Sequence, residues 1–163
     1  MSDIQTTNWS EVAANNTAAV PNGFPDNQPP SSVKFITREV MAGVKREYDR
    51  SHATATSGGS DPAYTLTYTS APPAYTNGLR FSFIASFTNT GTASLNVSGL
   101  GAVTINKQIS SGLAVLAAGD IVSGQHVECE YDSGAAVFVL LNPQSLSAGN
   151  LPKIGRASCR ERV

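Results

Sequence analysis

The chain has 163 residues, which is enough for one domain of ordinary size with an extension, but not for two comfortable cores. Apolar residues make up 40% of it and charged residues only 14%, well below the usual share of about a quarter, and the formal net charge is -1. This near-neutral composition argues against a nucleic-acid-binding protein and against attachment to an anionic membrane surface. Two cysteines are too few for a disulfide framework or a zinc cage, and no apolar run reaches the roughly 20 residues of a membrane helix. We therefore expect no cofactor, no metal and no membrane insertion.

Residues 1–31 are polar, with Asn, Ala, Thr and Pro dominant, and predict an extended N-terminal arm. The proline-rich segment 21–30 excludes a helix there, because proline removes backbone donors and fixes φ. Trp9 and Phe24 are the only large anchors of this arm. The first residues carry neither a basic segment nor an apolar core, so we expect no signal peptide.

A regular apolar pattern follows the arm and predicts an amphipathic helix over 32–50, with Ser31 or Ser32 as its N-cap. Its apolar side chains recur at spacings of three and four, with Met41 beside them: Val33, Ile36, Val40, Val44 and Tyr48. A lone helix this short is marginal in water, so the stripe must pack either on the following domain or on the same helix of neighbouring subunits. The narrow spacing, like that of heptad a and d positions, favours neighbouring subunits and predicts an oligomer seam.

Small residues fill positions 51–61 and predict a linker, after which the apolar period falls to two. The alternating runs lie at 64–68, 79–87, 95–97, 103–105, 127–131 and 137–141. Gly, Asn and Asp turns separate them. This spacing predicts a mainly β protein in which residues 62–142 form a small antiparallel β-sandwich or barrel domain.

Residues 143–153 return to a polar linker, and the last ten residues then change character abruptly. Segment 154–163 resembles, codon for codon, the translation of a common sequencing adapter. It carries three of the eleven basic residues and has no pattern to bury. We therefore leave it out of the fold prediction and expect the chain to be an N-terminal fragment of a longer protein.

Candidate chemical groups are few. Glu128 and Glu130 share one face of a predicted strand, but no pocket is indicated around them, so a solvated strand face is the better interpretation. Cys129 falls between inward-facing residues, where a buried, inert thiol is expected. His52 and His126 lack partners at the spacing of a zinc site or a catalytic triad. We therefore expect no enzymatic activity.

Several short phrases occur in an order that resembles the N-terminal module of bacteriophage and prophage tail fibre proteins. They are Pro-Pro-Ser-Ser-Val at 29–33, Arg-Glu-Val-Met-Ala at 38–42, Gly-Leu-Arg-Phe-Ser-Phe at 78–83 and Ala-Gly-Asp-Ile at 118–121. The likeness covers most of 9–142. At Lys34 and Phe35 the related pattern usually has Asn-Asp.

The resemblance implies a structural virion protein of the tail fibre, assembled in the host cytoplasm as a homotrimer for host adsorption. Its arm would attach to a tail or baseplate protein, with Trp9 and Phe24 as the attachment residues. The helix and β-domain would form the proximal shaft, and the distal part, beyond this chain, would meet the host receptor.

Two alternatives stay open. In one, the β-domain is itself a carbohydrate-binding adhesin, with Tyr75 as the candidate glycan contact, because core packing is the better interpretation for Tyr64 and Tyr68. In the other, the chain is the non-catalytic N-terminal part of a tail-associated depolymerase.

Overall fold

The helix α1 (Pro30–Ser51) begins earlier than predicted. The computed structural model describes residues 29–144, and in it Pro29 is the N-cap of α1 and Pro30 its first residue. Proline suits this position because the first backbone N–H of a helix has no intrahelical partner to lose. The Ser32 hydroxyl donates to the Pro29 carbonyl oxygen at 2.8 Å. The predicted N-cap at Ser31 or Ser32 is therefore wrong by two or three positions.

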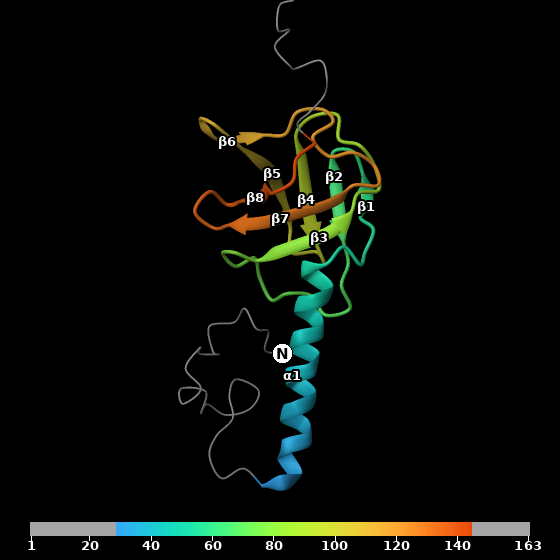
Figure 1. The fold of residues 1–163 in the computed structure, drawn as a ribbon, viewed down its shortest axis with the longest axis vertical. Helices are drawn as coiled ribbons and strands as arrows, with labels where there is room; N and C mark the ends of the chain where they lie inside the picture. Colours follow the sequence, from blue (N-terminus) through green and yellow to red (C-terminus); the bar gives the residue numbers. More distant parts are fainter. Residues whose placement is uncertain (1–28, 145–163) are drawn as a thin grey trace, which may run out of the picture.

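Eight strands follow the helix and form one curled sheet, a half-barrel (Figure 1). They are β1 (Gly58–Ser60), β2 (Ala63–Leu66), β3 (Arg80–Ile84), β4 (Ala93–Val97), β5 (Ala102–Ile109), β6 (Gly112–Val115), β7 (His126–Asp132) and β8 (Val137–Leu140). Their order across the sheet is β1-β2-β4-β5-β8-β7-β3, and β6 pairs with β5 outside this path. The predicted mainly β fold with a short helix in front of it is confirmed.

The sheet is mixed, whereas the sequence predicts antiparallel strands only. Strand β2 runs parallel to β4, and β5 runs parallel to β8, while the other five pairings are antiparallel. Alternation along a strand determines which side chains face inward, but it carries no information on the direction of the neighbouring strand. The inward faces are therefore predicted correctly even where the pairing is not.

The core lies on the concave side of the sheet, where every second residue of a strand faces inward. Its buried apolar members are Tyr64, Leu66, Leu79, Phe81, Phe83, Ala85, Ala93, Leu95, Val97, Ile105, Leu116, Ile121, Val127, Cys129, Phe138 and Leu140. Aromatic rings interlock at its centre, where the ring of Phe81 meets that of Phe138 edge-on at 5.7 Å between centroids. Such edge-to-face pairs stabilise a core beyond the area they bury.

The predicted linker 51–61 belongs in large part to the β-domain. The Ser57 N–H donates to the Ile84 carbonyl oxygen at 2.8 Å, and the Ile84 N–H donates to the Ala55 carbonyl oxygen at 2.9 Å. These bonds join the segment before β1 to β3, at the opposite end of the strand order. Gly59 has φ of +89°, and a Cβ there would stand 2.1 Å from the Ala63 carbonyl oxygen. The small residues thus permit close backbone pairing here. A small-residue composition is equally typical of a flexible linker, so the sequence alone does not separate the two.

Helix α1 leads away from the sheet, and only its C-terminal end meets the β-domain (Figure 1). Its 22 residues give a rod of about 33 Å. At the junction, Arg50 is only 1% exposed, and its Nη2 donates to the Ser70 carbonyl oxygen at 3.2 Å. The N-terminal part of the helix therefore extends beyond the β-domain (Figure 1).

A buried asparagine holds two loops of the β-domain together. The Asn89 side chain donates to the carbonyl oxygens of Gly91 (2.6 Å) and Ala117 (2.8 Å), and its Oδ1 accepts from the Ile121 N–H at 2.8 Å. Asn89 is 1% exposed and Ile121 is fully buried, so the Ile121 N–H has no access to water as a substitute partner.

We predict that Asn89→Ala lowers the free energy of unfolding by about 3 kcal/mol, because it removes three hydrogen bonds and leaves the buried Ile121 N–H without a partner. Urea unfolding at fixed protein concentration, followed by tyrosine fluorescence, measures this. Asn77→Ala is the control: Asn77 is exposed and accepts from the Ser133 N–H and hydroxyl, so the loss should stay below about 1 kcal/mol. Equal losses in the two variants would contradict the role of Asn89.

Candidate functional site

The predicted seam residues lie along one side of α1. We call Val33, Val40, Met41, Val44 and Tyr48 the apolar stripe. Their spacing puts them within one face of the helix, since residues three and four apart are neighbours on its surface. Ile36, the remaining predicted seam residue, lies at the border of this face and is buried at 8% exposure.

The apolar stripe is largely uncovered. The exposed fractions are Val33 42%, Val40 42%, Met41 65%, Val44 54% and Tyr48 48%. Near the junction, the Tyr48 ring stacks on His52 with 4.1 Å between ring centroids, and the Lys45 ammonium lies 5.1 Å from the Tyr48 centroid. The stripe is thus an exposed apolar face on a helix that its own β-domain does not cover.

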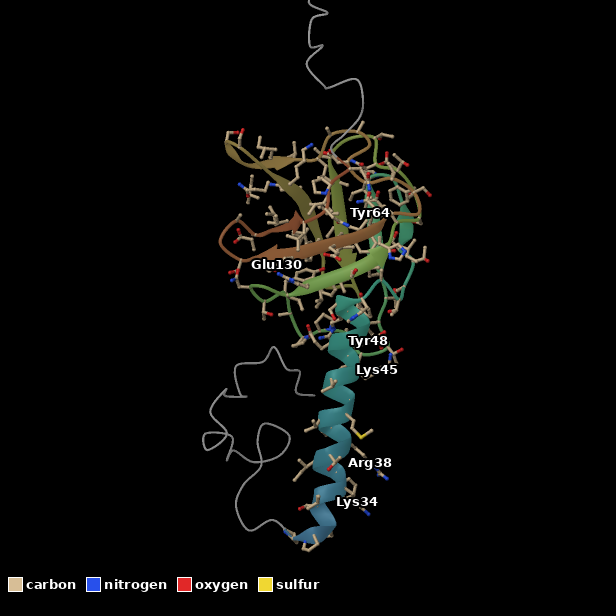
Figure 2. The ribbon with its side chains drawn as sticks, viewed as in Figure 1. Lys34, Arg38, Lys45, Tyr48, Tyr64 and Glu130 are labelled. Atoms are coloured by element: carbon tan, nitrogen blue, oxygen red, sulfur yellow. The ribbon has the colours of Figure 1, made fainter. Side chains whose placement is uncertain are left out.

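Basic side chains run beside the stripe. Lys34, Arg38 and Lys45 lie along one side of the helix (Figure 2). Lys45 forms an ion pair with Asp49 one turn further on. This is the usual arrangement of a helix whose apolar face packs against other helices while charged residues stay in water.

Tyr75, the candidate glycan contact, is half-buried and its hydroxyl has structural partners. The hydroxyl donates to the Gly101 carbonyl oxygen at 2.8 Å and accepts from the Val97 N–H at 3.0 Å. The ring meets Phe138 edge-on at 5.2 Å. Burial raises the pKa of Tyr75, and the hydrogen bond from Val97 opposes the shift in part. The contacts give Tyr75 a place in the packing of the β-domain, and glycan contact by Tyr75 stays a prediction.

The other chemical candidates fall where the sequence analysis puts them. Glu128 is exposed, and Glu130 forms an ion pair with Arg80 at 2.6 Å across the β3–β7 pair. Cys129 is buried, and burial raises the pKa of its thiol to about 12. Within residues 29–144, no three His, Cys, Asp or Glu side chains gather as a metal site. Trp9 and Phe24, the predicted attachment residues, lie outside the described residues.

One feature of the helix end escapes the sequence analysis. Nothing in the sequence pattern singles out Arg50, but the structure buries it where the end of α1 meets the segment after β2. Ile36, Gly43 and Arg50, the buried residues of α1, are spaced seven apart and so lie on one line along the helix. A row of residues seven apart that includes a glycine is the sequence signal that could have indicated a buried side of α1 next to the stripe.

No protein-family model matches the chain, and no curated protein is similar to it. The likeness to tail fibre modules therefore depends on the sequence phrases alone. In the part of the chain that the structure covers, α1 is not apolar enough to cross a membrane.

We predict that Tyr75→Phe lowers the stability of the β-domain by about 1–2 kcal/mol, because the Val97 N–H and the Gly101 carbonyl oxygen lose their shared partner. Urea unfolding at fixed protein concentration measures the change. Tyr48→Phe removes a hydroxyl from the exposed helix and should leave the midpoint in place. An unchanged midpoint for Tyr75→Phe would show that its hydroxyl has no structural role.

Proposed function

We propose that the chain is a non-enzymatic structural component of a phage tail fibre, in which three copies of α1 associate through the apolar stripe. In this proposal the arm 1–31 attaches to the tail, and the helix and β-domain build the proximal shaft. The observation that supports it is the uncovered apolar stripe on a helix that extends beyond its own domain.

The energetics favour covering this surface. Full burial of one large apolar side chain contributes about 1.5–3 kcal/mol, and the five stripe residues are each roughly half exposed. Their complete burial would therefore contribute on the order of 5 kcal/mol per helix. An isolated helix of this length is marginal in water, so the association of sister copies would stabilise the helix and the assembly together.

Identical copies can cover one another symmetrically. Each presents the same stripe, so a closed cyclic assembly around a common axis leaves no stripe exposed. Apolar residues at spacings of three and four along one face are typical of helices that pack against one another in bundles. The choice of three copies comes from the resemblance to tail fibre proteins.

We predict that the full chain has three times the 17.0 kDa monomer mass in light scattering after gel filtration, and that Val44→Lys lowers this mass to that of the monomer. Lysine in a seam would bring like charges together in a desolvated place. Lysine also has a higher helix propensity than valine, so lost association could not be blamed on a weaker helix.

Phe35→Lys is the matched control. Phe35 is 55% exposed but lies about 180° around the helix from Val44, outside the apolar stripe. The same substitution there should leave the trimer mass unchanged. A monomeric full chain, or equal effects of the two substitutions, would overturn the seam.

A further inference from the structure

Ile36 is the one buried residue in the part of α1 that extends beyond the β-domain. Among residues 29–42 it alone is buried, at 8% exposure, whereas Val33 and Val40 beside it on the helix surface are each 42% exposed. On a helix in water, a long side chain is covered only in part by its neighbours three and four residues away. A segment outside the helix therefore has to cover Ile36.

The β-domain does not supply this cover. Ile36 lies 15 residues before Ser51, the last residue of α1, which is about 22 Å along the helix axis. Figure 1 shows no other described segment beside this part of the helix. The structure holds one chain, so the cover has to come from residues 1–28 or 145–163 of the same chain.

Of these two segments, residues 1–28 are the nearer in the chain. They lead directly into α1, whose N-cap Pro29 lies about 10 Å along the helix from Ile36. Residues 145–163 follow Gln144, whose N–H donates to the Asp120 carbonyl oxygen at 2.8 Å in the loop after β6. Strand β6 lies at the end of the β-domain remote from α1 (Figure 1). Cover from the N-terminal arm needs only a reversal of the chain before Pro29.

The covered strip of the helix is narrow. The half-buried Ser32 and the buried Ile36 and Gly43 lie close to one line along α1, at spacings of four and seven. Glu39 and Val40, which flank this line on its two sides, are both exposed. A second helix would cover a face 100° or more wide and would bury the flanking positions too. A strip about one side chain wide fits a single extended segment.

Segment 21–28 has the composition of such a segment. Prolines at positions 21 and 25 exclude a helix and favour extended backbone. Phe24 is its only large apolar side chain and Asp26 its only charge. Phe24 lies five residues before Pro29, or about 17 Å of extended chain, which is enough for a turn and the return to Ile36. Asp26 and Asn27, between the two, are turn-forming residues.

We propose that segment 21–28, which we call the strap, folds back along α1 of its own chain and places the Phe24 ring on Ile36. The contact is favourable because both large apolar side chains leave water. Ile36 lies about 80° around the helix from Val44, so the strap runs beside the apolar stripe. The stripe stays available to sister copies.

The strap gives Phe24 two competing contacts. Phe24 is also the predicted attachment residue for the tail, so a tail protein that binds this ring has to displace the strap from α1 first. This competition rests on the proposed function. The strap itself lies within one chain and needs no partner.

The test uses NOE spectra of the full chain with ¹³C-labelled isoleucine methyl groups. We expect an NOE between the Ile36 methyl groups and the Phe24 ring, both in the parent and in the Val44→Lys chain, because the contact forms within one chain. Phe24→Ala should abolish this NOE and shift the Ile36 methyl resonances downfield, since a methyl group that faces a ring is shielded. Unchanged methyl resonances of Ile105 and Ile121 in the core verify the fold of each variant.

Phe35→Ala is the matched control. Phe35 lies on α1 itself at 55% exposure, about 100° around the helix from Ile36, so its loss should leave the Ile36–Phe24 NOE in place. Trp9→Ala, in the same arm, should also leave it in place.

Three results would overturn the strap. They are the absence of an Ile36–Phe24 NOE, an NOE from Ile36 to the Trp9 ring in its place, and loss of the NOE in the Val44→Lys chain, which would put the contact between chains. A full chain that is monomeric but retains the NOE would contradict the seam and support the strap, so the two proposals fail separately.

Discussion

The main physical constraint on α1 is its apolar stripe, which the β-domain leaves exposed. A helix of 22 residues that meets the β-domain only at its C-terminal end gains little tertiary stabilisation from that domain along most of its length. In the assembly that we propose, burial of the stripe by sister copies would supply that stabilisation and align the β-domains on one side of the bundle. Under this proposal, the same exposed apolar face that leaves an isolated helix marginal in water would be the surface through which the copies associate.

The β-domain, in contrast, is complete in itself. Its concave side holds an interlocked aromatic core, and its loops are fixed by buried polar groups. Besides Asn89, the partly buried pair of Lys107 and Asp120, 2.6 Å apart, holds β5 to the loop after β6, and Asp120 also accepts from the Ala117 N–H. The buried Arg50 then joins the end of the helix to the segment after β2 through its bond to the Ser70 carbonyl oxygen.

Two sequence patterns predict parts of this fold, the helical spacing and the strand period, and each predicts only which side chains share a face. Spacings of three and four indicate the helix and its stripe, and a period of two indicates the inward faces of strands such as β3 and β7. Neither pattern carries the direction of a neighbouring strand, so the parallel pairs β2–β4 and β5–β8 are not predicted. Short β1 lies in a small-residue segment, and β6 buries no face, so periodicity misses both. Residues 42–50 of α1 meet residues 67–70 in the folded chain, and no sequence pattern indicates a contact between segments this far apart.

Hydrogen exchange of the α1 amides at several protein concentrations tests the seam most directly, because it reports the covering of the helix itself. If sister copies cover the stripe, amides of residues 33–44 exchange slowly at high concentration and quickly after dilution, while the β-domain core stays protected throughout. Rapid exchange of these amides at every concentration, or protection that dilution does not change, would contradict a seam formed between chains.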